Sequence, residues 1–382
     1  MNQIGKIFVT AMVCMGLISC FKDEPLNAEC DIEKAWIHAD NPNMLFNNLS
    51  DTLITVQSDQ TSIIFTMQAG ADITALAPQF RLTEGATITP ENGSVQDFSK
   101  GPVVYTVTSE DKKWSRVYTV AVSALLSIGK ELHLDFDNYS KGNSKYYSWY
   151  EQWTTGSGVT SEARIWATGN PGFGISNGSA KPDEYPTVPD ENSYEGKGVK
   201  LVTRRTSKLA DMVKKPIAAG NLFIGRFDAQ SALQDAMKAT KFGLPFGFES
   251  KPITFSGYYK YESGENFTDK DMNVLDMVDK GTIYAVLYDN HDSDGNPVVL
   301  YGDNVQTSSQ IVALAQVADI STTREWTAFS VNFVYRKDVD AAKLKTGGYS
   351  FAVVCSSSNN GASFMGAVGS TLWVDKLTVT CE

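Results

Sequence analysis

Short runs in which apolar and polar residues alternate recur along most of this chain, and they limit what it can fold into. Three examples are "SRVYTVAVS" (115–123), "ITFSGYYKY" (253–261) and "TLWVDKLTV" (371–379). A period of two places successive side chains on opposite faces of a strand, whereas a helix needs a period near 3.6. Because turn-forming residues separate the runs, the sequence predicts an all-β fold.

The alternating runs fall into two groups, which predicts two domains in a chain of 382 residues. Residues 31–125 hold about five short runs, typical of a small antiparallel β-sandwich. This part resembles the immunoglobulin-like modules of exported bacterial proteins. Residues 130–382 hold about ten runs, for which one larger sandwich, a jelly roll, is expected.

One short helix is expected in the second group. Asp228 precedes "AQSALQDAMKAT", which is rich in strong helix formers, and Gly243 stands where a helix C-terminal glycine is common. By contrast, "IVALAQVAD" (311–319) alternates and is predicted to be a strand.

The first residues have the layout of a secretory signal. Lys6 precedes the apolar run 7–19, which is shorter than a membrane-spanning helix requires. The run ends in "LISC", which resembles the bacterial lipobox, whose cysteine is acylated after cleavage. Residues 1–19 are therefore predicted to be a lipoprotein signal peptide, with Cys20 as the lipid-bearing residue.

Residues 20–30 are then expected to be a tether. Lys22, Asp23 and Glu24 resemble the surface-export signal of lipoproteins in the Bacteroidetes phylum, although a solvated tether would carry similar charges. The resemblance implies an outer-membrane lipoprotein that is exposed on the cell surface.

Composition excludes several functions. The formal net charge of -11 disfavours nucleic acid as a partner, because binding a polyanion requires clustered Lys and Arg. No HExxH or Walker motif is present, so metallopeptidase and NTPase activities have no sequence support. After lipidation three cysteines would remain, at positions 30, 355 and 381, and an odd number leaves at least one thiol unpaired in a monomer.

Aromatic and polar residues gather in "YYSWYEQWTTGSG" (146–158) and "RIWATGNPGFG" (164–174). Flat aromatic rings stack on sugar rings, while amide and guanidinium groups bind hydroxyls, so a carbohydrate site is one interpretation. The alternative is that Trp166 is a core residue and that the glycines form a tight turn. The candidate carbohydrate-binding residues are Trp149, Trp153, Trp166, Gln152, Arg164 and Asn170. Trp149 and Trp153 are expected to be the most exposed of them.

Two groups of acids suggest calcium, bound as a structural cofactor. If the first and last strands of the larger domain are neighbours, Asp135, Asp137 and Asp375 could supply oxygen ligands to Ca²⁺. "DNHDSDGNP" (289–297) has the spacing of a calcium loop but lacks its final glutamate, so a turn with solvated acids is expected there.

A glycoside hydrolase would need two carboxylates across a cleft. The acids Glu151, Asp183, Glu184 and Glu191 flank the aromatic stretch or the loop that follows it. Most acids in such loops are solvated, so catalysis is a weaker expectation than binding.

Several segments together resemble one family. They are "LDFDNY", "IWATGNPGFGISNG", "YEGKGVKLVTR", "GNLFIGRF", "FSGYYKY", "YAVLYD", "EWTAFSVNF" and "GSTLWVDKLTV", in this order between residues 130 and 382. They resemble the PCMD family, the putative carbohydrate metabolism domain of Bacteroidetes lipoproteins. The resemblance implies a jelly roll similar to carbohydrate-binding modules in systems that acquire polysaccharides.

Three classes of function follow. The first is a surface lipoprotein that binds a polysaccharide or oligosaccharide, is held to the membrane by its lipid, and works beside an outer-membrane protein complex. The second is a glycoside hydrolase or polysaccharide lyase on the same scaffold. The third is a structural adhesin or scaffold subunit that binds protein.

Overall fold

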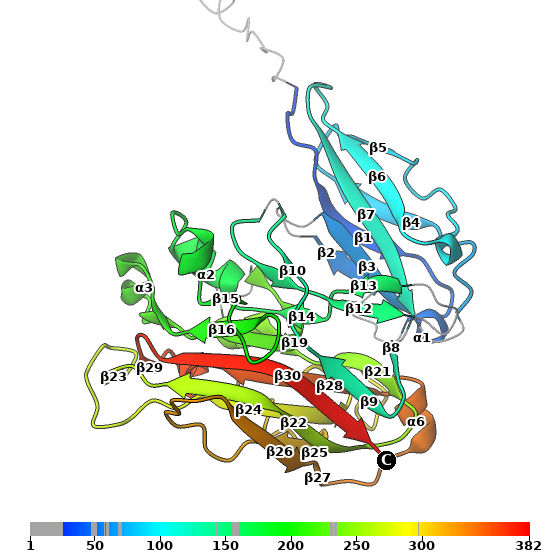
Figure 1. The fold of residues 1–382 in the computed structure, drawn as a ribbon. Coiled ribbons are helices and arrows are strands. Elements are labelled where there is room, and N and C mark those ends of the chain that lie inside the picture. The colour runs from blue at the N-terminus through cyan, green and yellow to red at the C-terminus, as the bar shows by residue number, and fades with distance from the viewer. Residues whose placement is uncertain are drawn as a thin grey trace, which may run out of the picture.

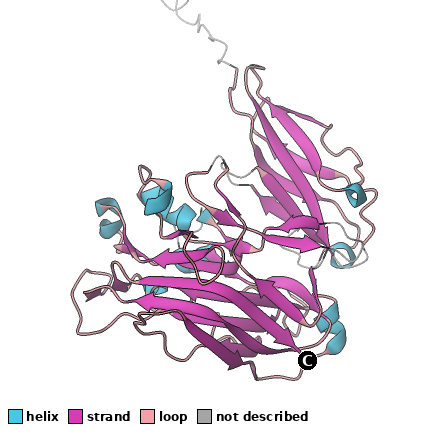
Figure 2. Ribbon diagram, viewed as in Figure 1, coloured by secondary structure: helices cyan, strands magenta, loops and turns pink. Residues whose placement is uncertain are grey.

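The computed structural model describes residues 26–382 apart from 47–51, 57, 59–60, 68–70, 125, 143, 155–159, 230–231, 233–234 and 297. The predicted signal peptide and lipid-bearing Cys20, together with Lys22, Asp23 and Glu24, lie outside the described residues. Strands dominate, as Figure 2 shows, and the all-β prediction is confirmed. None of the helices in the described ranges is long and apolar enough to cross a membrane.

The first domain is a sandwich of two sheets (Figure 1). One sheet has the order β2-β1-β4 and the other the order β3-β7-β6-β5. The strands are β1 (Ile32–Ile37), β2 (Leu53–Thr55), β3 (Ser62–Met67), β4 (Pro78–Leu82), β5 (Thr87–Thr89), β6 (Val103–Thr108) and β7 (Ser115–Ala124), and α1 is Pro42–Leu45. The inward-facing side chains, including Phe65, Tyr105 and Tyr118, form one buried core.

The pairing of β3 with β7 in this domain is parallel, whereas the other pairs are antiparallel. Trp114 lies at the β6–β7 turn and is 62% exposed.

The larger domain has two sheets that face each other. The nine-stranded sheet has the order β14-β19-β28-β24-β25-β27, with β20, β21 and β8 attached. Its strands are β8 (Leu126–Ile128), β14 (Trp166–Ala167), β19 (Asn221–Phe227), β20 (Thr240–Phe242), β21 (Leu244–Phe248), β24 (Thr282–Asp289), β25 (Ile311–Gln316), β27 (Val334–Tyr335) and β28 (Tyr349–Ser356).

The six-stranded sheet has the order β15-β16-β30-β22-β26, and β9 pairs with β30. Its strands are β9 (Glu131–Leu134), β15 (Thr187–Asp190), β16 (Gly198–Val202), β22 (Pro252–Glu262), β26 (Thr327–Asn332) and β30 (Thr371–Cys381). Both β22 and β30 alternate between buried and partly exposed residues, as expected from their sequences.

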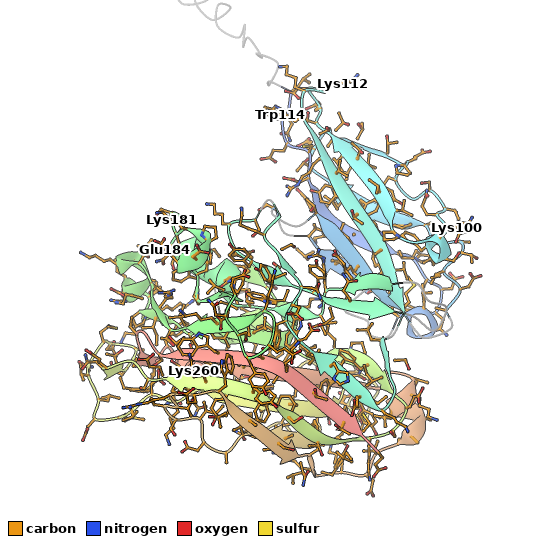
Figure 3. All side chains as sticks on the ribbon, in the orientation of Figure 1. Lys100, Lys112, Trp114, Lys181, Glu184 and Lys260 are labelled. Carbon is orange, nitrogen blue, oxygen red and sulfur yellow. The ribbon has the colours of Figure 1, made fainter. Side chains whose placement is uncertain are left out.

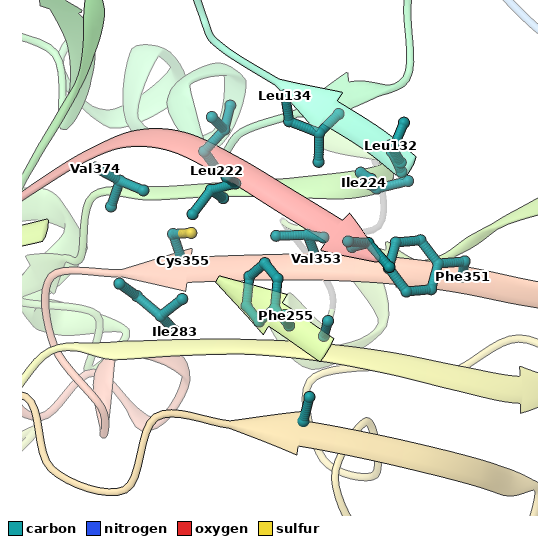
Figure 4. Close-up of a cluster of buried hydrophobic side chains, with 14 of the residues drawn as sticks. Leu132, Leu134, Leu222, Ile224, Phe255, Ile283, Phe351, Val353, Cys355 and Val374 are labelled. Atoms are coloured by element: carbon teal, nitrogen blue, oxygen red, sulfur yellow. The ribbon is translucent and has the colours of Figure 1, made fainter. Parts of the chain in front are cut away.

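The core of the larger domain lies between these two sheets. Figure 4 shows Phe255 of β22 and Val374 of β30 beside Val353 and Cys355 of β28, which belongs to the other sheet. The facing sides of the two sheets are therefore buried. At β24 and β28 the second side of the nine-stranded sheet is buried as well, whereas the second side of the six-stranded sheet is left for other contacts. Among the described residues, Cys30, Cys355 and Cys381 are free thiols, and the last two are buried.

Short pairs of strands and short helices lie outside the two sheets. They are β10 (Tyr139–Ser140), β11 (Ser148–Trp149), β12 (Glu151–Thr154), β13 (Thr160–Ala163), β17 (Arg204–Arg205), β18 (Ile217–Ala218), β23 (Phe267–Thr268), β29 (Gly366–Ala367), α2 (Asn170–Ser176), α3 (Lys208–Met212), α5 (Ala236–Ala239), α6 (Ala341–Lys345) and the 3₁₀ turns η2 (Phe98–Lys100), η3 (Pro182–Glu184) and η4 (Gly361–Ser363). The prediction of one helix was therefore wrong.

The helix expected after Asp228 is interrupted at Asp235. Ala229 and Ala232 before it are helical, and the amide of Ala232 donates to the carbonyl oxygen of Asp228 at 3.1 Å. Asp235 then caps the separate helix α5 through a 3.0 Å hydrogen bond from the amide of Met237. The chain enters β20 at Thr240, and Gly243 has a φ of +89° between two strands. Pairing of β20 with β19 overrides the local helix propensity.

The larger domain begins before residue 130. β8 pairs in parallel with β21, and its Ile128 is part of the larger core. The prediction therefore placed the start of the larger domain several residues too late, at residue 130. β8 has only three residues, and no turn signal separates it from β7, so no local pattern assigned it to the larger domain.

Candidate functional site

Of the two tryptophans expected to be exposed, the structure describes the side chain of Trp149 alone. Trp149, in β11, is only 1% exposed and packs into the larger core near Tyr139. The prediction of an exposed Trp149 was wrong, because the short β10–β11 pair turns this side chain inward. Trp153 lies in β12, but its side chain is outside the described residues.

Trp166 and Asn170 are buried structural residues. The indole Nε1 of Trp166 donates a 2.7 Å hydrogen bond to Oε1 of Glu151. The Asn170 side chain donates to the carbonyl oxygen of Thr187 at 2.8 Å and accepts from its amide at 3.0 Å, so its hydrogen-bonding groups tie α2 to β15. Neither is placed to bind a ligand, which corrects their assignment as carbohydrate-binding residues.

Gln152 and Arg164 reach the surface. Gln152 is exposed, and Arg164 is half-buried, forms a 2.6 Å ion pair with Glu162 and lies over the ring of Tyr150. The glycines 172 and 174 lie within α2 and do not form a loop. The polar half of the predicted site is thus accessible, but the described indole rings beside it are not.

β9, which the sequence predicts as the first strand of the larger domain, pairs with the last strand, β30, as the calcium hypothesis requires. However, the carboxylates there bind amides and a lysine. Asp375 accepts from the amides of Glu195 (2.9 Å) and Lys376 (2.7 Å), and Asp137 accepts from the amide of Lys197 (2.8 Å) and lies 3.5 Å from Nζ of Lys376.

Asp135 accepts a 3.1 Å hydrogen bond from the amide of Asp137. Within the described residues, no three His, Cys, Asp or Glu side chains are grouped so that they could hold a metal ion. The geometry therefore does not support Asp135, Asp137 and Asp375 as a calcium site. In the 289–297 segment, Asp292 accepts from the amides of Asp294 and Asn296, so this segment is a turn, as expected.

Glu151 is the one acid of the predicted catalytic set that is buried. It is 6% exposed, and burial raises its pKa to about 7, although the hydrogen bond from Trp166 opposes the shift and the charges of Asp135 and Asp137 add to it. Asp183, Glu184 and Glu191 are exposed and bind Tyr147, the amide of Lys181 and Tyr139 respectively.

A surface that the sequence prediction missed lies on the outer face of the six-stranded sheet. Trp373 of β30 points away from the core, because its neighbours Leu372 and Val374 point into it. Across the sheet, Lys200 of β16 and Lys260 of β22 are both in register with Trp373. Their Nζ atoms lie 5.5 and 4.4 Å from the centre of the indole ring.

Three more aromatic rings extend this surface. Tyr258 lies two residues before Lys260 on the same face of β22, and the ring of Tyr194 stacks on it with centroids 3.6 Å apart and planes inclined by 12°. Trp326, just before β26, meets Tyr194 edge-on at 6.2 Å. Tyr194 itself is 44% exposed. We call Tyr194, Tyr258, Trp326 and Trp373 the aromatic platform.

The chemistry of the platform differs from that of a core. Its rings are half-buried or exposed, and they lie beside lysines that project from neighbouring strands (Figure 3 labels Lys260). Flat rings of this kind stack on the CH faces of ligands, and cationic groups beside them bind acceptors. The sequence did contain the signal, since "YYKY" (258–261) and "LWVDK" (372–376) place an aromatic residue on the polar side of an alternating strand.

A hollow elsewhere in the larger domain is less suited than the aromatic platform to a ring-shaped ligand. It has a volume of about 320 Å³ and lies beside α2 and η3, where Figure 3 labels Lys181 and Glu184. Burial lowers the pKa of Arg204, which lines it, and its aromatic lining residue Phe173 is itself buried. The hollow thus offers charge without an open aromatic face.

The architecture defines an all-β protein in which a small sandwich precedes a larger one with an open, aromatic sheet face. Residues 135–380 match the family described as "Putative carbohydrate metabolism domain", and residues 45–122 match the family described as "SGBP, N-terminal". The chain belongs to the Putative carbohydrate metabolism domain family.

Two solved structures from Bacteroides are similar to this chain, and both are described as putative glycoside hydrolases. The protein from Bacteroides thetaiotaomicron VPI-5482 is 37% identical with a TM-score of 0.78, over 94% of this chain and 99% of that one. The protein from Bacteroides vulgatus ATCC 8482 is 36% identical with a TM-score of 0.58, over 67% of this chain and 100% of that one. None of the curated proteins matches the chain.

Proposed function

We propose that this protein binds a glycan on the aromatic platform without cleaving it, as part of polysaccharide acquisition. The observation that carries the proposal is the cluster of four aromatic side chains on the open side of the six-stranded sheet. Membership of a carbohydrate-related family and the match of the first domain to an SGBP N-terminal domain, from surface glycan-binding proteins, support it.

The test compares Trp373→Ala and Tyr194→Ala with the matched control Trp114→Ala, which removes an exposed indole from the first domain. Each platform variant should lose about fivefold in affinity, since an aromatic contact contributes on the order of 1 kcal/mol. Isothermal titration against a polysaccharide panel measures this. Wild-type affinity in both platform variants, or an equal loss in the control, would remove the platform from the binding site.

The cellular location of the protein is also a proposal, and it rests on the sequence. The protein is an outer-membrane lipoprotein, anchored through Cys20 and exposed on the cell surface, where it works beside an outer-membrane protein complex. Cys20→Ala should release it from membrane fractions; unchanged partitioning would contradict the anchor. Added protease should cleave it on intact cells, and replacement of Lys22, Asp23 and Glu24 by alanine should protect it.

Hydrolysis is the second candidate, because Glu151 has the raised pKa that a general acid needs and the two similar Bacteroides proteins are described as putative glycoside hydrolases. Binding is favoured over it because Glu151 is buried and its Oε1 is held by Trp166. Release of reducing sugar by the wild type, lost in Glu151→Gln, would establish the enzyme instead. A protein-binding adhesin or scaffold is the third class. The absence of both glycan retention and sugar release would point to it.

A further inference from the structure

The lysines beside Trp373 indicate the charge of the ligand, which the aromatic rings do not. Lys200 and Lys260 stand on the two strands that flank β30, each directly opposite Trp373 in the register. Their ammonium groups therefore approach one ring from two sides, at 5.5 and 4.4 Å from its centre.

Both lysines are held there by weak contacts. Among the described residues, neither forms an ion pair with Asp or Glu, and only the indole ring binds their ammonium groups. A cation–π contact at an exposed site is worth little, whereas a hydrogen bond from an ammonium to an anionic oxygen is about twice as strong as a neutral one. An anion above the ring could therefore draw both ammonium groups to itself.

The lysines differ in this respect from Lys280 and Lys376, which form ion pairs with Asp319 and Asp137 respectively. The formal net charge of -11 repels a polyanion over long distances, but such repulsion is screened beyond about 8 Å at physiological ionic strength. Two cations in direct contact with the ligand would outweigh it locally.

We propose that the ligand of the aromatic platform is an acidic glycan, one of whose rings stacks at Trp373 with its carboxylate or sulfate group bound between Lys200 and Lys260. This inference rests on the proposed function and adds the chemical class of the glycan. A neutral glycan would leave both ammonium groups without an anionic partner.

The test uses the full chain and three kinds of polysaccharide: a polyuronate, a sulfated polysaccharide and the neutral polymer dextran. The polyuronate and the sulfated polymer distinguish a carboxylate from a sulfate. Lys200→Gln and Lys260→Gln should each weaken binding of the acidic polymer about two- to fivefold, as expected for exposed charge pairs. Lys181→Gln is the matched control and should bind as the wild type does, because Lys181 is an exposed lysine at the N-cap of η3.

Salt gives a second readout. Raising the ionic strength from 0.1 to 1 M shortens the Debye length from about 10 to about 3 Å, so binding of the acidic polymer should weaken and the lysine variants should be less sensitive to salt than the wild type. Trp373→Ala should lower affinity whatever the salt concentration.

Failure of this inference can be separated from failure of the proposed function. Binding of dextran that depends on Trp373 but not on the two lysines would overturn the acidic ligand and keep the glycan platform. Wild-type affinity of Trp373→Ala alone would overturn this inference. If no polysaccharide binds, or if Trp373→Ala and Tyr194→Ala both bind as the wild type does, both proposals are overturned. Tighter binding of a single-stranded oligonucleotide than of either acidic polysaccharide would also overturn the inference, because stacking with lysines can serve bases as well.

Discussion

At the scale of single residues, Glu151 links burial to the pH dependence of stability. Its pKa is near 4.5 in a solvated chain and about 7 in the folded protein. The folded state therefore binds more protons between these values, and the free energy of unfolding should fall as the pH rises from about 4.5 to about 7, then level off.

Replacing this acid by an amide should remove that dependence. Glu151→Gln keeps an oxygen that can accept from Trp166 and has no charge to bury, so it should be more stable than the wild type above pH 7, by up to about 3 kcal/mol. Urea unfolding between pH 4 and 8 measures the difference. Parallel pH profiles for the two proteins would contradict a raised pKa at Glu151.

Two tryptophans with opposite environments give the second prediction. Trp149→Ala removes a core side chain and should cost about 3 to 5 kcal/mol of unfolding free energy, whereas Trp373→Ala, on the sheet surface, should cost about 1 kcal/mol or less. Thermal and urea unfolding compare them. If both variants lost the same stability, Trp373 would be a packing residue and not part of a binding surface.

At the scale of elements, close approach of strands depends on one glycine. Gly220 precedes β19, and a Cβ atom there would lie 2.3 Å from the amide nitrogen of Val202 and 2.4 Å from the carbonyl oxygen of Pro186. Neither backbone atom can move freely, because Val202 N donates to Pro186 O at 2.7 Å. This glycine lets the start of β19, in one sheet, pass beside the end of β16, in the other.

Gly220→Ala should therefore destabilise the protein by about 2 kcal/mol or more, as overpacking does. Gly129→Ala is the control, since a Cβ there would meet nothing within 4 Å, and it should be neutral or slightly stabilising. Chemical unfolding measures both. A Gly220 variant as stable as the control would mean that the strands can separate at no cost.

At the scale of the whole molecule, the two domains have separate cores, which predicts two unfolding units. The core of the first domain is built from residues 32–120, and the buried clusters of the larger domain lie between Ile128 and Cys381. A fragment that starts at residue 124 keeps β8 on β21, whereas one that starts at residue 130 removes it and uncovers an edge of the nine-stranded sheet.

Scanning calorimetry can test this arrangement. The fragment from residue 124 should melt close to one transition of the full chain, and the fragment from residue 130 should melt lower because Ile128 is missing from its core. Both fragments retain the aromatic platform and should bind the same glycans. Equal melting temperatures for the two fragments would show that β8 adds nothing to the larger domain.

The sequence by itself determined the strands and the two faces of each, because alternation is a local property that follows from the geometry of an extended chain. It identified "TLWVDKLTV" and "ITFSGYYKY" as strands with Leu372, Val374 and Phe255 on one side, and the structure places all three in the core. It also predicted the family.

Only the tertiary structure decided which aromatic side chains are covered and which meet solvent. Trp149 stands in a polar stretch yet is buried, while Trp373 stands between two apolar residues yet faces outward between two lysines. Local sequence divides a strand into two faces, but whether an outer face stays open depends on segments far away in the chain. Lys200, Tyr258 and Trp373 become neighbours only when β16, β30 and β22 pair, and no local pattern specifies that order.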